Sequence, residues 1–126
     1  MASTKTTVGL TPEARVIIDD LLERLGFKEL ADVRDIAVAH AIRRGIKVKK
    51  VSGITNVWGA AQTSDDLVAI LRVVYPEDAE EDVIVLYENL ANLGLEDLGT
   101  DKNYRRWKDI TDLPGLNVDT ADVERS

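Results

Sequence analysis

The chain has 126 residues and no cysteine, and its one histidine is His40. The absence of cysteine excludes disulfides, thiolate metal sites and a cysteine nucleophile, and it fits a reducing cytoplasm of bacterial type. No apolar run approaches the roughly 18 residues of a membrane helix, and residues 1–5 lack the apolar core of a signal peptide. We therefore expect a cytoplasmic protein without a membrane partner.

Sequence motifs for catalysis and cofactor binding are also scarce. Gly53 and Gly59 are not followed by a Lys-Ser/Thr pair, and no Gly-x-Gly-x-x-Gly occurs. The carboxylates of residues 77–82 match no calcium loop and suit the first turn of a helix. We interpret His40 as a hydrogen-bonded histidine at a helix or subunit interface. The sequence predicts no catalytic constellation and no cofactor.

Positive charge is scarce overall, because the formal net charge is −7. Residues 1–50 contain 10 Lys/Arg and 7 Asp/Glu, giving +3, whereas residues 51–126 contain 6 and 16, giving −10. Nucleic-acid affinity depends on neutralising phosphates, so the chain as a whole is a poor general binder. Any polyanion should contact the first half.

A strand–helix–helix unit is predicted over residues 5–45. Residues 5–10 alternate like a half-buried strand, and Thr11-Pro12 is typical of a helix start. The first helix should end at Gly26, and a second should run from after Phe27 to about Arg44, with Gly45 as its cap.

The remaining residues predict a mainly α fold with two or three further helices. After a short strand or extended loop through Trp58, we expect helices from Thr63 and from Glu77 to Leu93, the latter stopped by Gly94. A short helix should follow Asp101. We expect a single helical domain over residues 1–115, with its C-terminal helices at 63–110 and a disordered tail at 116–126.

The order of these elements resembles the ribbon-helix-helix DNA-binding family. The resemblance includes a first helix that opens with Leu10-Thr11-Pro12-Glu13 and a Leu-Gly-Phe hinge at residues 25–27. With its longer helical continuation, the chain also resembles the DNA sulfur-modification E proteins. The resemblance implies that two strands from two chains pair and enter the major groove. An isolated strand leaves its backbone groups open, so we expect a homodimer or higher homo-oligomer.

The candidate nucleic-acid contacts follow from this resemblance and from the basic segment, which we define as residues 43–50. Gly9 offers no side chain to a base, and Glu29 and Asp32 place acids near the second helix's start. We therefore expect the basic segment to carry more of the contact than the strand. The predicted contact residues are Lys5, Thr7, Lys28, Arg43, Arg44, Lys47, Lys49 and Lys50.

Two functions remain open. One is a DNA-binding or DNA-modification accessory protein, to which the aromatic and basic residues 104–108 could add base stacking, although Trp107 more often packs on its own domain. The alternative is an acidic helical oligomerisation or adaptor module that binds another protein rather than nucleic acid. The net charge of −7 and the two apolar C-terminal helices favour this alternative.

Overall fold

The computed structural model describes residues 5–115, and its first helices begin and end at the expected caps. The Thr11 hydroxyl accepts a hydrogen bond from the Ala14 N–H at 3.1 Å and opens α1, Pro12–Leu25. Gly26, with φ 81°, closes it in the left-handed conformation. Helix α2, Leu30–Arg44, ends in the same way at Gly45 with φ 63°. These boundaries confirm the sequence prediction.

The short β-sheet departs from the expected arrangement. Strand β1, Thr7–Leu10, pairs antiparallel with β2, Thr55–Gly59, of the same chain. The register places Val8 opposite Trp58 and Gly9 opposite Asn56, with an irregularity between Val8 and Gly9. The premise that β1 needs a second copy to complete its sheet is therefore wrong, because residues after the basic segment supply the second strand. Oligomerisation itself stays a prediction.

Two more helices follow the sheet. A 3-10 turn at Ala60–Gln62 leads to α3, Asp65–Val74, whose first turn is capped by the Ser64 hydroxyl. Helix α4, Pro76–Gly99, contains a break at Asp82 with φ −163° and ψ 103°. The Asp82 carboxylate accepts the N–H groups of Ile84 and Val85, so it caps the longer second part of α4.

The predicted end of α4 at Leu93 is wrong, because the helix continues through Gly94 to Gly99. Gly94 lies where α4 crosses α2, and a Cβ atom there would lie 2.1 Å from the Ala37 carbonyl oxygen. Gly94 therefore serves close helix packing and not termination. Beyond α4, the expected helix after Asp101 is a 3-10 turn at Tyr104–Arg106, followed by another at Ile110–Asp112.

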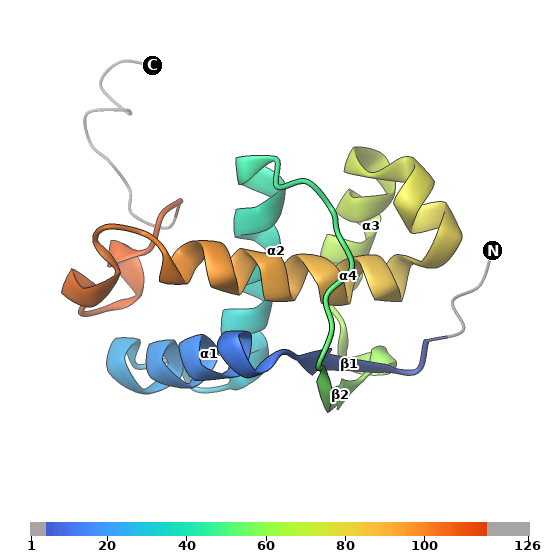
Figure 1. Ribbon diagram of the computed structural model, residues 1–126. Coiled ribbons are helices and arrows are strands. Elements are labelled where there is room, and N and C mark those ends of the chain that lie inside the picture. Colours follow the sequence, from blue (N-terminus) through green and yellow to red (C-terminus); the bar gives the residue numbers. More distant parts are fainter. Residues whose placement is uncertain (1–4, 116–126) are drawn as a thin grey trace, which may run out of the picture.

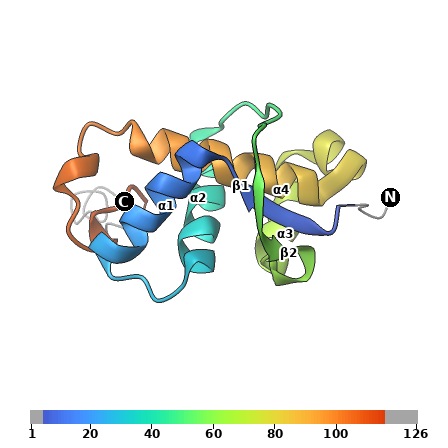
Figure 2. The same ribbon diagram turned by 60° about the horizontal axis from the view of Figure 1, so that its bottom comes forward.

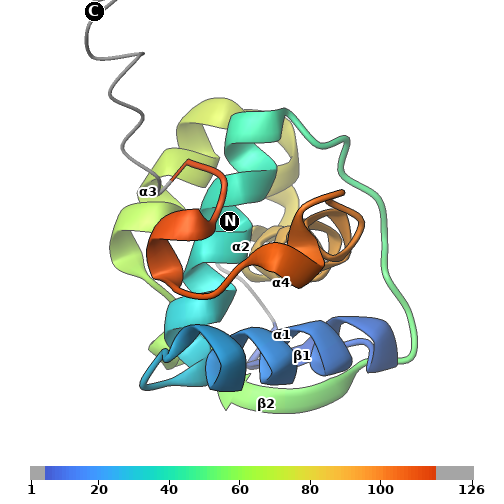
Figure 3. The same ribbon diagram turned by 90° about the vertical axis from the view of Figure 1, so that its left-hand side faces the viewer.

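Helix α4 lies at the centre of the arrangement (Figure 1). The sheet and α1 lie on one side of it, while α2 and α3 pack against it elsewhere. Figure 2 shows β1 running alongside α4, and Figure 3 views the molecule nearly along α4, with the connector between α2 and β2 passing along one side. The fold is mainly α with a short N-terminal strand, as the sequence predicts.

The C-terminal tail expected to be disordered lies outside the described residues. Within residues 5–115, none of the helices is both long and apolar enough to cross a bilayer.

Candidate interaction surfaces

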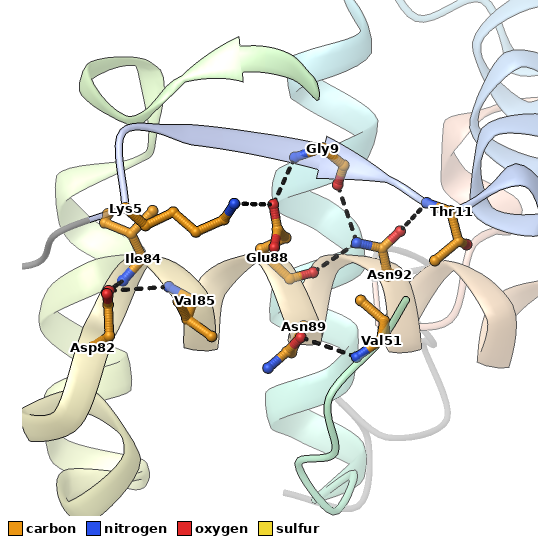
Figure 4. A network of polar contacts seen from close by, with 10 residues as sticks. All are labelled: Lys5, Gly9, Thr11, Val51, Asp82, Ile84, Val85, Glu88, Asn89 and Asn92. Carbon is orange, nitrogen blue, oxygen red and sulfur yellow. Dashed lines mark hydrogen bonds and ion pairs between the residues drawn. The ribbon is translucent and has the colours of Figure 1, made fainter. Parts of the chain in front are cut away.

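Strand β1 is closed along both edges. One edge pairs with β2, and at the other edge the Gly9 N–H donates to Glu88 Oε2 at 2.9 Å (Figure 4). The Asn92 side chain donates to the Gly9 carbonyl at 3.1 Å and accepts from the Thr11 N–H at 2.8 Å. These side chains from α4 replace the neighbouring strand that an isolated β1 would need. Pairing of β1 with a strand of a second copy would therefore have to displace β2 or the α4 side chains that bind Gly9 and Thr11.

The two predicted contact residues on or beside β1 are held within the chain. Lys5 Nζ lies 3.3 Å from Glu88 Oε2, and its side chain is 26% exposed. Thr7 is half-buried and stands opposite Gly59. Gly9 is required by packing, because a Cβ atom would lie 2.5 Å from the Thr55 carbonyl oxygen. The face of β1 predicted to read DNA is therefore engaged with β2 and α4.

The arginines of the basic segment bind acceptors of the chain. Arg43 donates to His40 Nδ1 at 2.8 Å and to the Pro114 carbonyl at 2.9 Å. Arg44 Nε lies 3.3 Å from Asp97 Oδ2, although the Arg44 side chain is 61% exposed. Arg43 is thus a tether for the C-terminal segment, whereas Arg44 keeps most of its surface in solvent.

The lysines of the basic segment are exposed on the connector that follows α2. Among residues 5–115, no carboxylate forms an ion pair with Lys47, Lys49 or Lys50. Arg44, Lys47 and Lys49 border an open hollow of about 590 Å³. These lysines are predicted contact residues that the structure leaves exposed.

Acidic residues face part of the same segment. A second hollow of about 350 Å³ has Lys49 and Lys50 on one side and Asp78, Glu81 and Asp82 on the other. Carboxylates so close weaken the local positive potential. Lys28 does not add to the segment, because it precedes α2 while the segment follows it, and the 15 residues of α2 span about 22 Å.

His40 is held between two charged partners at the α2–α4 contact. Its Nε2 lies 2.7 Å from Asp97 Oδ2, and its Nδ1 lies 2.8 Å from Arg43 Nη2. Because arginine can only donate, Nδ1 accepts and Nε2 carries the proton of a neutral ring. Burial lowers the pKa of His40, although the hydrogen bond to Asp97 opposes that effect. Both ring nitrogens are occupied, which confirms the structural role predicted from the sequence.

The second basic and aromatic cluster, residues 104–108, packs on α1. Trp107 is 4% exposed, and its ring centroid lies 5.4 Å from that of Tyr104. The Tyr104 hydroxyl donates to Asp20 at 2.6 Å, and Arg24 also binds Asp20 at 2.8 Å. These hydrogen bonds lower the pKa of Asp20, while burial raises that of Tyr104 to about 12. The Trp107 ring is therefore not free for base stacking, whereas the Tyr104 ring is half-buried.

Arg34 is a buried residue that the sequence reasoning missed. It is 1% exposed, lies over the rings of Trp58 and Tyr87 at 4.8 and 5.3 Å, and donates to the Gln62 carbonyl at 2.9 Å. The Tyr87 hydroxyl donates to Asp35, which also accepts from Arg34. Position 34 shares the helical stripe of Leu30 and Ala37, and that periodicity was the available signal. Arg34 joins α2, β2 and α4.

Helix α3 has three exposed large apolar side chains, more than any other helix described. We define the α3 face as Asp66, Ala69, Ile70 and Val73, which share one side of the helix. Val73 is 80% exposed and Ile70 is 44% exposed, and beside the face Val74 is 47% exposed. On the opposite side, Leu71 is fully buried. A single exposed apolar residue is ordinary, but a group on one helix indicates an interaction surface.

Comparison with known proteins supplies no relative. No protein-family model matches the chain, and neither the curated proteins nor the solved structures give a match. Within residues 5–115, no three His, Asp or Glu side chains are gathered in a way that could hold a metal ion. The functional argument therefore depends on the surfaces described above.

Proposed function

We propose that this chain is a helical oligomerisation or adaptor module that binds protein through the α3 face. The observation that carries the proposal is the combination of the buried Leu71 with Ile70 and Val73, which are 44% and 80% exposed on the same short helix. Covering these side chains removes apolar area from water, which drives most protein association. Asp66 at one end of the face and Asp65 beside it keep the free surface soluble.

A photo-crosslinking residue placed at position 73 tests this function in cells that express the protein. We expect a defined protein adduct from position 73 and none from position 16, because Val16 is similarly exposed, at 70%, but is the only exposed large apolar residue on α1. Adding Ile70→Asp to the position 73 variant should abolish the adduct. Absence of any adduct at position 73, or equal adducts at both positions, contradicts the proposal.

A second candidate function is contact with the DNA backbone through Arg44, Lys47, Lys49 and Lys50. Its support is the exposure of these cations and the absence of an ion pair to the three lysines within the described residues. The resemblance to ribbon-helix-helix proteins also implies DNA binding, but both edges of β1 are occupied. This candidate therefore uses phosphate contacts and no strand readout.

A gel-shift experiment separates this candidate from the first. Replacing Lys47, Lys49 and Lys50 with glutamate should abolish a shift that itself weakens steeply with salt, because phosphate binding releases counterions. Lys28→Glu is the matched control and should keep most of the shift. A native protein that gives no shift in low salt, or a triple variant that binds equally, overturns DNA binding and leaves the role of α3 untouched.

A further inference from the structure

Resting on the proposed function of the α3 face, we infer that its partner is the α3 face of a second copy, with the two helices antiparallel. Ala69, Ile70 and Val73 form the apolar part of the face, and this part matches a second copy of itself in chemistry, as an isologous interface requires. The small Ala69 lies between Asp66 and Val73 on the face. A small residue at that place permits close approach of the two helix backbones, with Ile70 and Val73 packing on either side.

The charges of α3 select the antiparallel orientation. Asp65 and Arg72 are seven residues apart, so they lie on the same flank of the helix, one near each end. A two-fold axis near Ala69 brings Arg72 of each copy beside Asp65 of the other. A parallel pair related by a two-fold axis would instead place the Asp65–Arg72 flanks of the two copies on opposite edges of the contact, so neither Arg72 would have an Asp65 beside it. The single helix therefore carries a self-complementary charge pattern.

The position of α3 in the fold allows this contact. Helix α3 packs on α4 and α2 through its opposite side, and Figure 3 shows it at the outside of the molecule. The helix has 10 residues and is about 15 Å long, so it buries less than the ~800 Å² per partner of a standard interface. The dimer should consequently be weak and depend on protein concentration.

Engineered cysteines test the geometry directly, because the native chain contains none. Ala69→Cys places a thiol near the proposed axis, where Cα atoms of two copies come within the ~7 Å that a disulfide tolerates. Under mild oxidation we expect disulfide-linked dimers from Ala69→Cys and at least about tenfold slower linkage from Val16→Cys. Equal and slow linkage of the two variants overturns the pairing.

A charge exchange tests the orientation. Arg72→Asp should weaken the dimer several-fold in sedimentation experiments over a concentration series, because each Asp65 then meets an aspartate. Combining Asp65→Arg with Arg72→Asp should restore the dimer, since each pair is again attractive. Arg72→Asp without effect, or a double variant no better than Arg72→Asp alone, contradicts the antiparallel arrangement.

The outcome also separates this inference from the proposed function. If position 73 crosslinks a different protein while Ala69→Cys forms no disulfide, the adaptor function stands and self-pairing is wrong. If position 73 gives no adduct and Ala69→Cys gives no disulfide, both are wrong. Val73→Asp should weaken a self-paired dimer by roughly tenfold or more, because it removes apolar burial from both copies.

Discussion

Helices α3 and α4 are neighbours in the chain, separated only by Tyr75, but their side chains differ in solvent exposure. In α3 only Leu71 is buried, and Ile70, Val73 and Val74 are exposed. In α4 almost every residue from Val83 to Leu95 is buried, polar ones included. Apolar content alone therefore does not tell which helix forms the core.

The buried polar residues of α4 explain the difference. Glu88 and Asn92 pair the open backbone groups of β1, and Asn89 accepts the Val51 N–H at 3.3 Å (Figure 4). An unpaired buried backbone group costs as much as a lost hydrogen bond, so these polar residues stabilise the core better than apolar ones. Among residues 5–115, no side chain of α3 binds the backbone of another strand or helix. The side chains on the exposed face of α3 are therefore available to a partner.

The largest effect on this contrast is expected from Asn92→Leu. The substitution keeps the size of a fully buried side chain but leaves the Thr11 N–H and the Gly9 carbonyl without partners. We expect a loss of about 2–5 kcal/mol in the free energy of unfolding, measured by urea denaturation. Asn103→Leu, at an exposed position, is the control. Equal stability of Asn92→Leu and the native protein would show that β1 does not need α4.

A smaller loss in the free energy of unfolding is expected from Gly94→Ala at the crossing of α2 and α4. The new methyl group would meet the Ala37 backbone, so the helices must separate at a cost of about 1–3 kcal/mol or more. Gly59→Ala is matched to it, because nothing lies within 4 Å of a Cβ atom there. Thermal melting should place Gly94→Ala clearly below Gly59→Ala, and the reverse order would contradict the crossing.

The α2–α4 contact should also respond to pH through His40. Burial lowers the folded-state pKa of His40, so the folded protein favours the neutral ring. The contribution of the neutral His40 ring to the free energy of unfolding is therefore complete above the unfolded-state pKa of about 6.5. This contribution is lost as the pH falls through the lower folded-state pKa, by at most about 1.4 kcal/mol per pH unit. Urea unfolding at about pH 7.5 and about pH 5.5 should show a larger drop for the native protein than for His40→Gln. Equal drops would contradict this prediction.

The smallest change in stability is expected on the α3 face. Val73→Ala should alter the free energy of unfolding by less than about 0.5 kcal/mol when measured on dilute protein, because Val73 is 80% exposed. Leu71→Ala, on the buried side of the same helix, should cost about 2–5 kcal/mol. A large loss from Val73→Ala in dilute solution would mean that this face supports the fold itself.

Local signals in the sequence located most helix boundaries. Thr11, Gly26 and Gly45 each cap the helix expected of them, and Ser64 caps α3 one residue after the expected start at Thr63, because capping depends on residues a few positions away. The error at Gly94 came from the same rule, since a glycine stop and a glycine at a helix crossing look alike in sequence. The two cases differ in whether a neighbouring backbone lies against the glycine, as that of Ala37 does at Gly94.

Local sequence signals could not identify contacts between residues that lie far apart in the chain. The pairing of β1 with β2 and the burial of Arg34 depend on segments that lie far apart in the chain. The resemblance to a two-chain ribbon therefore suggested the wrong partner for β1. Exposure of Lys47, Lys49 and Lys50 agrees with their polar character, whereas the solvent exposure of Val73 could not be told from its sequence pattern.

The connection between β1 and α4 has a consequence for biosynthesis. The Gly9–Glu88 and Thr11–Asn92 hydrogen bonds join residues 79 and 81 positions apart. The ribosome makes β1 before α4, so the residues that complete this edge of β1 emerge later by the same sequence separation. Helices α1 and α2 can form locally before that time, whereas β1 must wait for a slow, long-range closure. Strand β1 therefore gains the hydrogen bonds of its second edge only after α4 has been made.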